Sequence, residues 1–391
     1  MLFQTLDSKE ECVGSYVNGE LHFDTLPNNL THTWGWAHYL PDNIEYAQIY
    51  CNGQSLDEVC PSHLKDKWDR VNSQLKAFFR SFSLAKIDMS EICFFDLVQK
   101  SFLEEHSEIK NSICQWVFEN YERPEIHDHI IEIQKVLRKI SHRQLNIDYA
   151  LVTKEAYRQK VRNFQKKLGN YKTSIDYSVF GAVTGRLTTS RRSFPILRFE
   201  KEMRHFLKPN HDWFVEFDYN AADLRSLFFI LDKPQPQMDI HDWNIQNVFG
   251  SHVQREDAKR LIFSWLYDLN KKDQKLEKAY GRDHILKTCW DGKQIVNPFG
   301  RRVACDQDHA ISYLIQSTTA DYVLNKMVKV SKMLEGMKSE VAFSIHDSVI
   351  VDMDWEERHI IGDILSIMRE DGFVSSVHTG KDFGNMKELK I

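Results

Sequence analysis

The segment FSIHDSVIVD, residues 343–352, places a histidine and an aspartate in the middle of an apolar run. The apolar residues on either side of His346 and Asp347 suit two short buried strands. Two interpretations are open: a plain turn between the strands, or a turn that exposes the Asp347 carboxylate at a sheet edge where a cation binds. A second carboxylate in a similar position elsewhere in the chain would favour the second interpretation.

The segment VEFDYNAADLR provides a second aspartate at the end of an apolar strand. Asp218 lies where strand-like alternation gives way to a helical pattern, so its side chain can be exposed at a sheet edge. Mg²⁺ prefers oxygen ligands and commonly takes one or two protein carboxylates together with substrate phosphates. A pair of such ions stabilises the attacking and leaving oxygens of phosphoryl transfer. Two aspartates 129 residues apart do not establish such a site by themselves.

The segment QREDAKRLIFSWLYD has two basic and two aromatic residues spaced by four. Arg255, Lys259, Phe263 and Tyr267 therefore form one slowly winding stripe on a helix. Such a stripe fits a nucleoside triphosphate, with the cations at the phosphates and the rings at the sugar and base. A helix with surface ion pairs and two core aromatic residues is the alternative for this segment taken alone.

The charge of the 391-residue chain is distributed unevenly around a net value of −5. Residues 154–208 hold fourteen Lys and Arg against four Asp and Glu, a local charge of +10 that leaves −15 for the remainder. Residues 1–60 hold nine acidic residues and a single base, Lys9. We therefore expect residues 154–208 to form a surface for a polyanion, although a solvated helix face would give the same charge run.

The N-terminus and the cysteines predict an intracellular protein. MLFQTLDSKEE has neither the basic n-region nor the apolar run of a secretion signal. No apolar stretch approaches the roughly 18 residues that span a bilayer. The seven cysteines form no CxxC pair, which favours free thiols over a structural zinc site. We expect a cytoplasmic protein with no membrane partner.

Periodicity and turn signals divide the chain into a β-rich start and a largely helical continuation. YVNGELHF, residues 16–23, has Asn18-Gly19 between alternating apolar positions and predicts a hairpin. A single long basic helix is expected over residues 154–171. A strand is expected at 212–220, with a helix directly after it. Further helices are expected at 241–249, 254–267 and 313–336, followed by a strand pair around 346–347 and a final helix and strand.

Seven of these segments together resemble the family A DNA polymerases, the group of bacterial DNA polymerase I and many phage replicative enzymes. In chain order the matches are TGRL to TGRLSS, DYNAADLR to motif A (DYSQIELR), DIH to the same tripeptide before the fingers, REDAKRLIFSWLYD to motif B, NPFGRRV to FGRRR, IQSTTAD to QGTAAD, and SIHDSVIVD to motif C (VHDE). All lie in the family's order within residues 155–391, and the Asn-Ala of motif A is closest to the phage enzymes.

The resemblance implies an α+β fold shaped like a right hand, with a palm made of an antiparallel sheet plus helices, helical fingers and a helical thumb. The implied division is an acidic β-rich N-terminal region at 1–60 (an exonuclease remnant or a docking surface), the thumb and preceding helices at 61–165, the first part of the palm at 166–236, the fingers at 237–307 and the second part of the palm at 308–391.

The resemblance also implies the roles of individual residues. Asp218 and Asp347, assisted by the backbone carbonyl of Tyr219, would hold two Mg²⁺ ions, for which Mn²⁺ can substitute. Around the incoming nucleotide, Lys259 would act at the triphosphate and the leaving pyrophosphate, and the phosphates of the nucleotide would be bound by Arg255, His241 and Arg198. Phe263 would stack on the incoming nucleotide, Tyr267 would lie behind the templating position, and Asp223 would act in sugar selection. On the primer–template, Gln316 and His346 would contact the minor groove at the primer end, and Arg186 would bind a backbone phosphate.

Motifs A, B and C each contain one departure from the family pattern. Motif C has Ser348 where a glutamate is usual, motif B ends in Asp268 in place of glycine, and motif A has Asp223 in place of glutamate. None of them removes a metal-binding aspartate, so the resemblance implies an active enzyme.

The implied function is template-directed addition of dNTPs to a primer 3′-hydroxyl on primer–template DNA. The 60 to 90 residues before the helical region leave too little room for the proofreading 3′–5′ exonuclease domain that relatives commonly carry. We therefore expect no intrinsic proofreading, and a separate exonuclease polypeptide or other replication proteins as partners, in the host cytoplasm if a phage encodes the chain. A single-subunit RNA polymerase is one alternative, disfavoured by Asp223, where those enzymes have a small residue. A catalytically silent nucleic-acid-binding subunit is the other, disfavoured by the retained aspartates and motif B cations.

Overall fold

The structure is a computed structural model that describes residues 2–5, 14–23, 27, 30–34, 44–46, 49–51, 54–87, 89, 92–250 and 252–390. The chain divides into two compact units, Met1–Ile131 and Glu132–Ile391, and each is described by itself. In the part of the chain that is described, no helix is long and apolar enough to cross a membrane.

The first unit contains a five-stranded sheet with the strand order β3-β2-β1-β4-β5. Its strands are β1 (Leu2–Thr5), β2 (Gly14–Val17), β3 (Glu20–Phe23), β4 (His32–Thr33) and β5 (Glu45–Tyr46). The strands β1, β2 and β3 pair antiparallel, whereas β1, β4 and β5 pair parallel. Asn18 and Gly19, both with positive φ, form the β2–β3 turn, so the predicted hairpin is confirmed.

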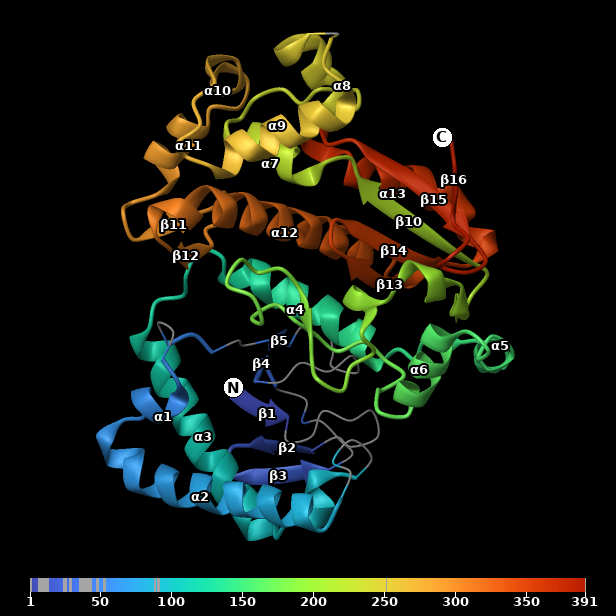
Figure 1. The fold of residues 1–391 in the computed structure, drawn as a ribbon. Helices are drawn as coiled ribbons and strands as arrows, with labels where there is room; N and C mark the ends of the chain where they lie inside the picture. Colours follow the sequence, from blue (N-terminus) through green and yellow to red (C-terminus); the bar gives the residue numbers. More distant parts are fainter. Residues whose placement is uncertain are drawn as a thin grey trace. The chain divides into compact units, whose positions relative to one another are not determined.

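Helices complete the first unit and lie beside the sheet in Figure 1. They are α1 (Leu56–Val59), α2 (Ser62–Leu84), the 3₁₀ helix η1 (Phe94–Leu97) and α3 (Lys100–Asn120), and α4 (His127–His142) continues into the second unit. The helices α2 and α3 pack through an apolar cluster around Trp68, Val71 and Ile113. This cluster explains the three- and four-residue apolar spacing of both segments.

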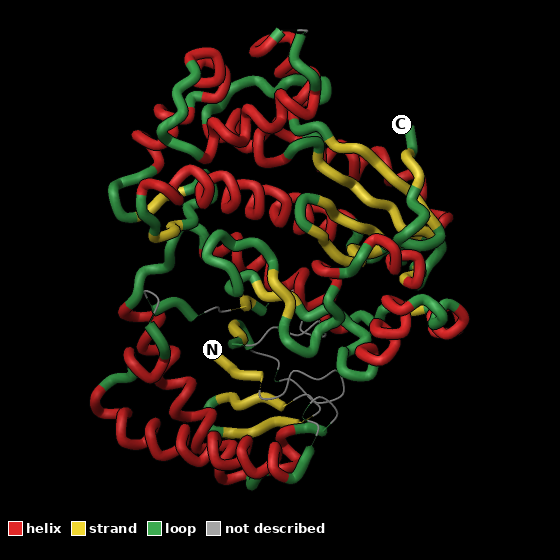
Figure 2. The backbone as a smooth tube through the Cα atoms, in the orientation of Figure 1, coloured by secondary structure: helices red, strands yellow, loops and turns green. Residues whose placement is uncertain are grey.

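The second unit is built on an antiparallel sheet with the order β13-β14-β10-β15-β16. Its strands are β10 (Trp213–Tyr219), β13 (Glu340–Ile345), β14 (Ser348–Met353), β15 (Ser375–Gly380) and β16 (Lys387–Glu388). Figure 2 shows these strands together as the large yellow group. All residues of β14 are buried, which accounts for its nearly continuous apolar run.

Short paired strands and many helices surround this sheet. The helices are α5 (Tyr149–Lys154), α6 (Gln159–Leu168), η2 (Ile196–Arg198), η3 (Lys201–Phe206), α7 (Ala222–Ile230), α8 (Ile240–Asn244), the π-helix η4 (Ile245–Phe249), α9 (Arg255–Tyr267), α10 (Gln274–Tyr280), α11 (Arg282–Cys289), α12 (Gln307–Met333), η5 (Trp355–Ile360), α13 (Ile361–Met368) and η6 (Glu370–Gly372). The paired strands are β6 (Asn146–Ile147) with β9 (Leu207–Lys208), β7 (Tyr177–Ser178) with β8 (Thr188–Thr189), and β11 (Gln294–Val296) with β12 (Arg302–Ala304).

The long helix α12 connects the sheet to the helices that follow β10. It packs against β13, β14, α7 and α13 as well as against α9 and α11. Its buried residues join those of α7, α9 and α11 in one apolar core that includes Leu227, Ile262, Ile285, Ile311 and Ile315. The sheet and these helices are therefore held together by α12.

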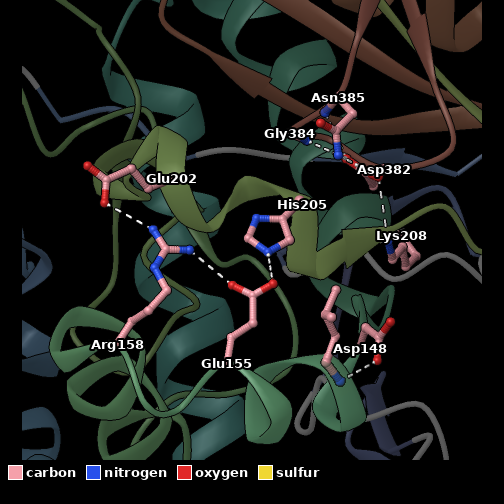
Figure 3. A network of polar contacts seen from close by, with 10 residues as sticks. Asp148, Glu155, Arg158, Glu202, His205, Lys208, Asp382, Gly384 and Asn385 are labelled. Atoms are coloured by element: carbon pink, nitrogen blue, oxygen red, sulfur yellow. Dashed lines mark hydrogen bonds and ion pairs between the residues drawn. The ribbon is translucent and has the colours of Figure 1, made fainter.

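The single basic helix predicted over residues 154–171 is wrong, because the chain breaks between α5 and α6. Glu155 lies at the break and pairs with Arg158 and His205, as Figure 3 shows. Arg162 donates hydrogen bonds to the carbonyls of Ala156 and Tyr157, which would otherwise be helix acceptors. Side chains from both sides thus stabilise a turn that the local periodicity did not reveal.

The cysteine prediction holds for most described thiols and fails for one. The free cysteines are Cys51, Cys60, Cys114, Cys289 and Cys305. Cys93 is disulfide-bonded, so the expectation of free thiols is wrong at this position. Cys12 lies outside the described residues.

Candidate active site

Asp218 and Asp347 lie at neighbouring strand ends, as the sequence predicts. In the antiparallel pairing of β10 with β14, Asp218 stands opposite Ser348, the residue that follows Asp347. The backbone N–H of Tyr219 donates to the carbonyl of Asp347 at 3.4 Å. His346 and Asp347 form the two-residue turn of the β13–β14 hairpin, and His346 has a φ of +54°. A tight hairpin turn therefore brings the two aspartates to one edge of the sheet.

The two carboxylates repel each other in a partly buried place. Burial raises the pKa of Asp218 to about 7, and the negative charges of Asp347 and Glu216 add to the rise. Burial also raises the pKa of Asp347. Among the described residues, neither carboxylate forms an ion pair. A divalent cation would remove this repulsion, so the donor set fits a hard metal ion such as Mg²⁺.

The neighbouring residues of the hairpin are occupied within the fold. The Ser348 hydroxyl donates to the Ile345 carbonyl at 3.0 Å, and the Ser344 hydroxyl donates to the Ser348 carbonyl at 2.9 Å. The Tyr219 hydroxyl donates to the Met368 carbonyl at 2.8 Å in a buried position. Ser348 therefore holds the hairpin turn, where a glutamate would have supplied a further carboxylate, and only the backbone of Tyr219 is left to assist a metal ion.

A cleft of ≈ 1240 Å³ opens in front of the two aspartates. Ten of the predicted site residues line it: Arg186, Asp218, Tyr219, Asp223, His241, Arg255, Lys259, Phe263, His346 and Asp347. They come from five of the quoted segments, all in the second unit, so the fold brings together residues that are far apart in the sequence.

Three other predicted site residues do not line this cleft. Tyr267 lies next to the cleft, since its ring stacks on that of Phe263 with 6.0 Å between centroids. The Gln316 side-chain amide donates to the Ser312 hydroxyl on the same helix, α12. Arg198 is exposed at the end of η2.

The stripe on α9 presents its two cations differently. Arg255 donates to the Asp239 carboxylate at 2.9 Å. Lys259 is exposed and has no carboxylate partner among the residues that the structure describes. Lys259 is therefore the cation of the stripe that is open to an anionic ligand.

Asp239 links three of the motifs. Its carboxylate caps α8 by accepting the backbone N–H groups of His241 and Asp242, and it also accepts from Asn220 and Arg255. Although burial acts to raise the pKa of Asp239, these hydrogen bonds hold it at about 2. The ionised carboxylate of Asp239 thus connects motif A with motif B through hydrogen bonds.

His241 lies at the start of α8 with one ring nitrogen unused. The residue is buried, and its Nδ1 atom has no hydrogen-bond partner among the residues that the structure describes. Burial lowers the pKa of its imidazole. A buried polar atom without a partner at the wall of a cleft fits a ligand that supplies the missing hydrogen bond.

Sequence reasoning missed a buried ion pair that supports the cleft. The Arg301 guanidinium binds Asp321 with two hydrogen bonds of 2.7 and 2.8 Å, and Asn297 donates to the same carboxylate. A Cβ atom on Gly185, which has a φ of +76°, would lie 2.4 Å from the Arg301 guanidinium carbon. A glycine is therefore required beside Arg301, and it places Arg186 at the cleft. In the sequence, the only signal for this pair was the resemblance of the FGRR and QSTTAD segments to segments of the polymerase family.

Two buried arginines were also missed. Arg225 on α7 donates to the carbonyls of Asn220, Pro236 and Met238. Arg282 donates to the carbonyls of Asp268 and Lys271 just after α9 ends. Both arginines hold loops by satisfying backbone acceptors. Only Arg225 gave a sequence signal, because it is a single arginine within the apolar segment LRSLFFIL.

The basic segment 154–208 is partly neutralised by its own acids. Lys160 pairs with Glu200 at 2.9 Å and with Glu202 at 3.3 Å. Figure 3 shows Arg158 between Glu202 and Glu155. Lys166 and Lys167 on α6 are exposed and have no carboxylate partner among the described residues. The cations left for a polyanion are therefore fewer than the sequence suggests.

No protein-family model matches the chain. The chain is similar to the DNA polymerase I of Borreliella burgdorferi, with 23% identity over 290 residues. The aligned part is 68% of this chain and 31% of that protein, so the chain spans about a third of its length.

A solved structure shares the fold. It is the POL domain of Pol1 from M. smegmatis in complex with DNA primer–template and dNTP. The two structures agree with a TM-score of 0.56 at 11% identity, over 73% of this chain and 76% of the other. The predicted α+β polymerase fold is thereby confirmed.

Proposed function

We propose that the chain is a template-directed DNA polymerase of family A, of the phage type, which adds dNTPs to a primer 3′-hydroxyl. The observation that carries this proposal is the uncompensated pair Asp218–Asp347 at the wall of a cleft that Lys259 and Phe263 also line. Such a cleft combines acids for a metal ion, a cation for phosphates and a ring for a base. The similarity to a DNA polymerase I and to a polymerase domain bound to primer–template and dNTP supports it.

Asp218 and Asp347 hold two Mg²⁺ ions in this proposal, with Mn²⁺ able to replace them. When bound, the metal ions lower the pKa of the primer hydroxyl and stabilise the leaving pyrophosphate. The chain contributes the fixed positions of both carboxylates through the β10–β14 pairing and the hairpin turn. The Tyr219 backbone carbonyl assists from the end of β10.

The residues of α8 and α9 bind the nucleotide. Lys259 neutralises the triphosphate and donates a proton toward the leaving pyrophosphate. Arg255 and His241 bind the outer phosphates, and Asp239 fixes the guanidinium of Arg255 for this task. Phe263 stacks on the incoming base, since its ring lines the cleft one turn beyond Lys259.

The remaining predicted residues complete the site. Tyr267 lies behind the templating position and is held parallel to Phe263. Gln316 and His346 contact the minor groove at the primer end, where every base pair presents an acceptor. Arg186 binds a backbone phosphate of the primer–template, and Arg198 assists at the triphosphate.

The proposal includes the absence of proofreading by this chain. A metal-dependent exonuclease needs clustered carboxylates. Among the strand residues of the first unit whose side chains the structure describes, the acid is Glu20 on β3. A separate exonuclease polypeptide would then be a partner. Purified protein with a mismatched primer, Mg²⁺ and no nucleotide tests this: shortening of the primer that persists in Asp347→Asn would contradict it.

Primer extension tests the proposed activity. Wild-type protein should extend a primed template with dNTPs in Mg²⁺ and use NTPs poorly. Asp347→Ala should lose extension while keeping primer–template binding, and Asp363→Asn, an exposed acid on α13, is the matched control. Extension with NTPs in preference to dNTPs would favour an RNA polymerase. DNA binding by the wild type without any extension would favour a silent binding subunit.

A further inference from the structure

Two departures from the family pattern meet in space at the wall of the cleft. Asp223 on α7 stands where the family has a glutamate, and Thr319 on α12 stands where the family's QGTAAD has its first alanine of the pair. The Thr319 hydroxyl donates a hydrogen bond to the Asp223 carboxylate at 3.1 Å. The shorter acid is thus accompanied by a hydroxyl that reaches it, although the two residues are 96 positions apart.

A second hydroxyl orients the first. The hydroxyls of Ser226 and Thr319 are 2.8 Å apart in a fully buried contact. A hydroxyl has one hydrogen to donate, and that of Thr319 goes to Asp223, so Ser226 must be the donor in this contact. Asp223 and Ser226 lie three residues apart on α7, which places both on the face that α12 covers. The result is a relay from Ser226 through Thr319 to Asp223, in which each hydrogen bond strengthens the next.

The opposite side of Asp223 faces the open cleft. Arg186 lies 3.5 Å from the oxygen that accepts from Thr319. Burial raises the pKa of the Tyr267 hydroxyl to about 12, and the negative charge of Asp223 adds to the rise. No hydrogen bond joins Asp223 to Tyr267, and both are described residues. The carboxylate is therefore held by α12 and Arg186, whereas Tyr267 does not hold it.

In the proposed function the nucleotide sugar lies in the cleft that Asp223, Lys259 and Phe263 all line. With the phosphates at Lys259 and the metal-binding acids, and the base on Phe263, the sugar falls between these groups. The negative charge of Asp223 contributes to the raised pKa of both Asp347 and Tyr267. A carboxylate fixed beside the sugar would hinder an added 2′-hydroxyl more strongly than one that is free to rotate.

We propose that Thr319 is a positioning residue for sugar selection, and that its hydroxyl holds the Asp223 carboxylate in the conformation that excludes ribonucleotides. This inference rests on the proposed polymerase function. The hydroxyl of Thr319 compensates for the methylene that Asp223 lacks, because it fixes from α12 a side chain too short to be fixed by Tyr267. Ser226 acts behind Thr319 by keeping its hydrogen directed at the carboxylate.

The test is the ratio of kcat/KM for an NTP to that for the matching dNTP in single-nucleotide primer extension. Thr319→Val keeps the side-chain shape and removes the hydroxyl, and it should raise the ratio about 10-fold, since hydrogen bonds to charged groups are worth a factor of this order or more. Thr319→Ser keeps the hydroxyl and should restore the wild-type ratio. Thr318→Val is the matched control, because the neighbouring Thr318 hydroxyl is buried without a hydrogen-bond partner.

A double-mutant cycle separates this role from a general effect on packing. In an Asp223→Ala background, adding Thr319→Val should change the ratio by less than about 2-fold, because the group that Thr319 positions is gone. An unchanged ratio in Thr319→Val, or a full effect in the Asp223→Ala background, would overturn the inference. Equal effects of Thr319→Ser and Thr319→Val would overturn it too. Failure of the wild type to extend the primer at all would instead overturn the proposed function.

Discussion

The two ends of the central sheet in the second unit treat their aspartates in opposite ways. At one end, Asp352 on β14 is buried and accepts hydrogen bonds from Arg143 and from the backbone N–H groups of Asn210 and His211. At the other end, Asp218 and Asp347 face the cleft without an ion-pair partner among the described residues. The same strand, β14, begins beside the uncompensated pair and ends at the compensated acid.

This difference separates acids whose charge is compensated within the fold from acids whose charge is open to a ligand. A buried carboxylate is costly unless a cation or hydrogen-bond donors compensate it. Asp352 and Asp321 both have an arginine for this purpose. Asp218 and Asp347 have each other, which is unfavourable, and we propose that a bound cation compensates them.

The largest effect on activity should come from neutralising either aspartate at the cleft. Asp218→Asn or Asp347→Asn should reduce primer extension by several orders of magnitude, because the amide cannot bind Mg²⁺ as a carboxylate does. Primer–template binding should persist. Single-turnover extension and a direct binding assay measure the two quantities, with Asp363→Asn as the control. Near-normal extension by either variant would refute the assignment.

Neutralising Asp352, at the opposite end of the sheet, should change the stability of the fold. Asp352→Asn should lower the free energy of unfolding by about 3 kcal/mol, because it removes the buried carboxylate partner of Arg143 and leaves only the half-exposed Glu340 at 3.0 Å. Asp347→Asn should not destabilise the metal-free protein, since it removes a repelling charge. Chemical denaturation of both variants checks the contrast. Equal losses of stability would show that the two ends do not differ in compensation.

The pH dependence of stability should differ between wild type and Asp218→Asn in chelator-containing buffer. The raised pKa means that folded Asp218 keeps its proton between about 3.8 and about 7, where the unfolded carboxyl is ionised. The folded state binds more protons in this window, so the contribution of Asp218 to stability falls as the pH rises through it. The Tm of Asp218→Asn relative to wild type should therefore increase from acidic pH to neutral pH. Parallel Tm curves would contradict the raised pKa.

The smallest effect should come from the basic surface. If about five phosphates are neutralised, a plot of log K against log salt should have a slope near −4 to −5. Reversing Lys166 and Lys167 to glutamate should reduce the magnitude of the slope by about 2, because each phosphate contact contributes roughly 0.9. Arg162 is unsuitable for this test, since it binds the carbonyls of Ala156 and Tyr157. Lys278→Glu on α10 is the control, and an unchanged slope in the double variant would exclude this surface.

Much of the site could be predicted because its signals are local. The strand ends at Asp218 and Asp347 and the four-residue spacing on α9 depend on neighbouring residues only, and the structure brings these segments to one cleft. The Asn18-Gly19 hairpin was predicted for the same reason. The family resemblance added the fold, which the structural likeness confirms.

The compensation of the acids could not be predicted, because it depends on partners that are distant in the sequence. Arg143 reaches Asp352 across 209 positions, and Thr319 reaches Asp223 across 96. No periodicity distinguishes an aspartate that will meet an arginine from one that will not. The helix break after Lys154 was missed because His205, 50 positions from Glu155, helps to stabilise the turn.

Metal binding in the absence of nucleotide tests the central claim most directly. Mn²⁺ titrated into the protein can be followed by the loss of the free-ion signal in electron paramagnetic resonance. Wild type and Asp363→Asn should bind Mn²⁺ alike, whereas Asp218→Asn and Asp347→Asn should bind at least about 10-fold more weakly, because each removes a charged oxygen ligand. Binding by both variants with wild-type affinity would show that the uncompensated acids at the cleft are not the metal site.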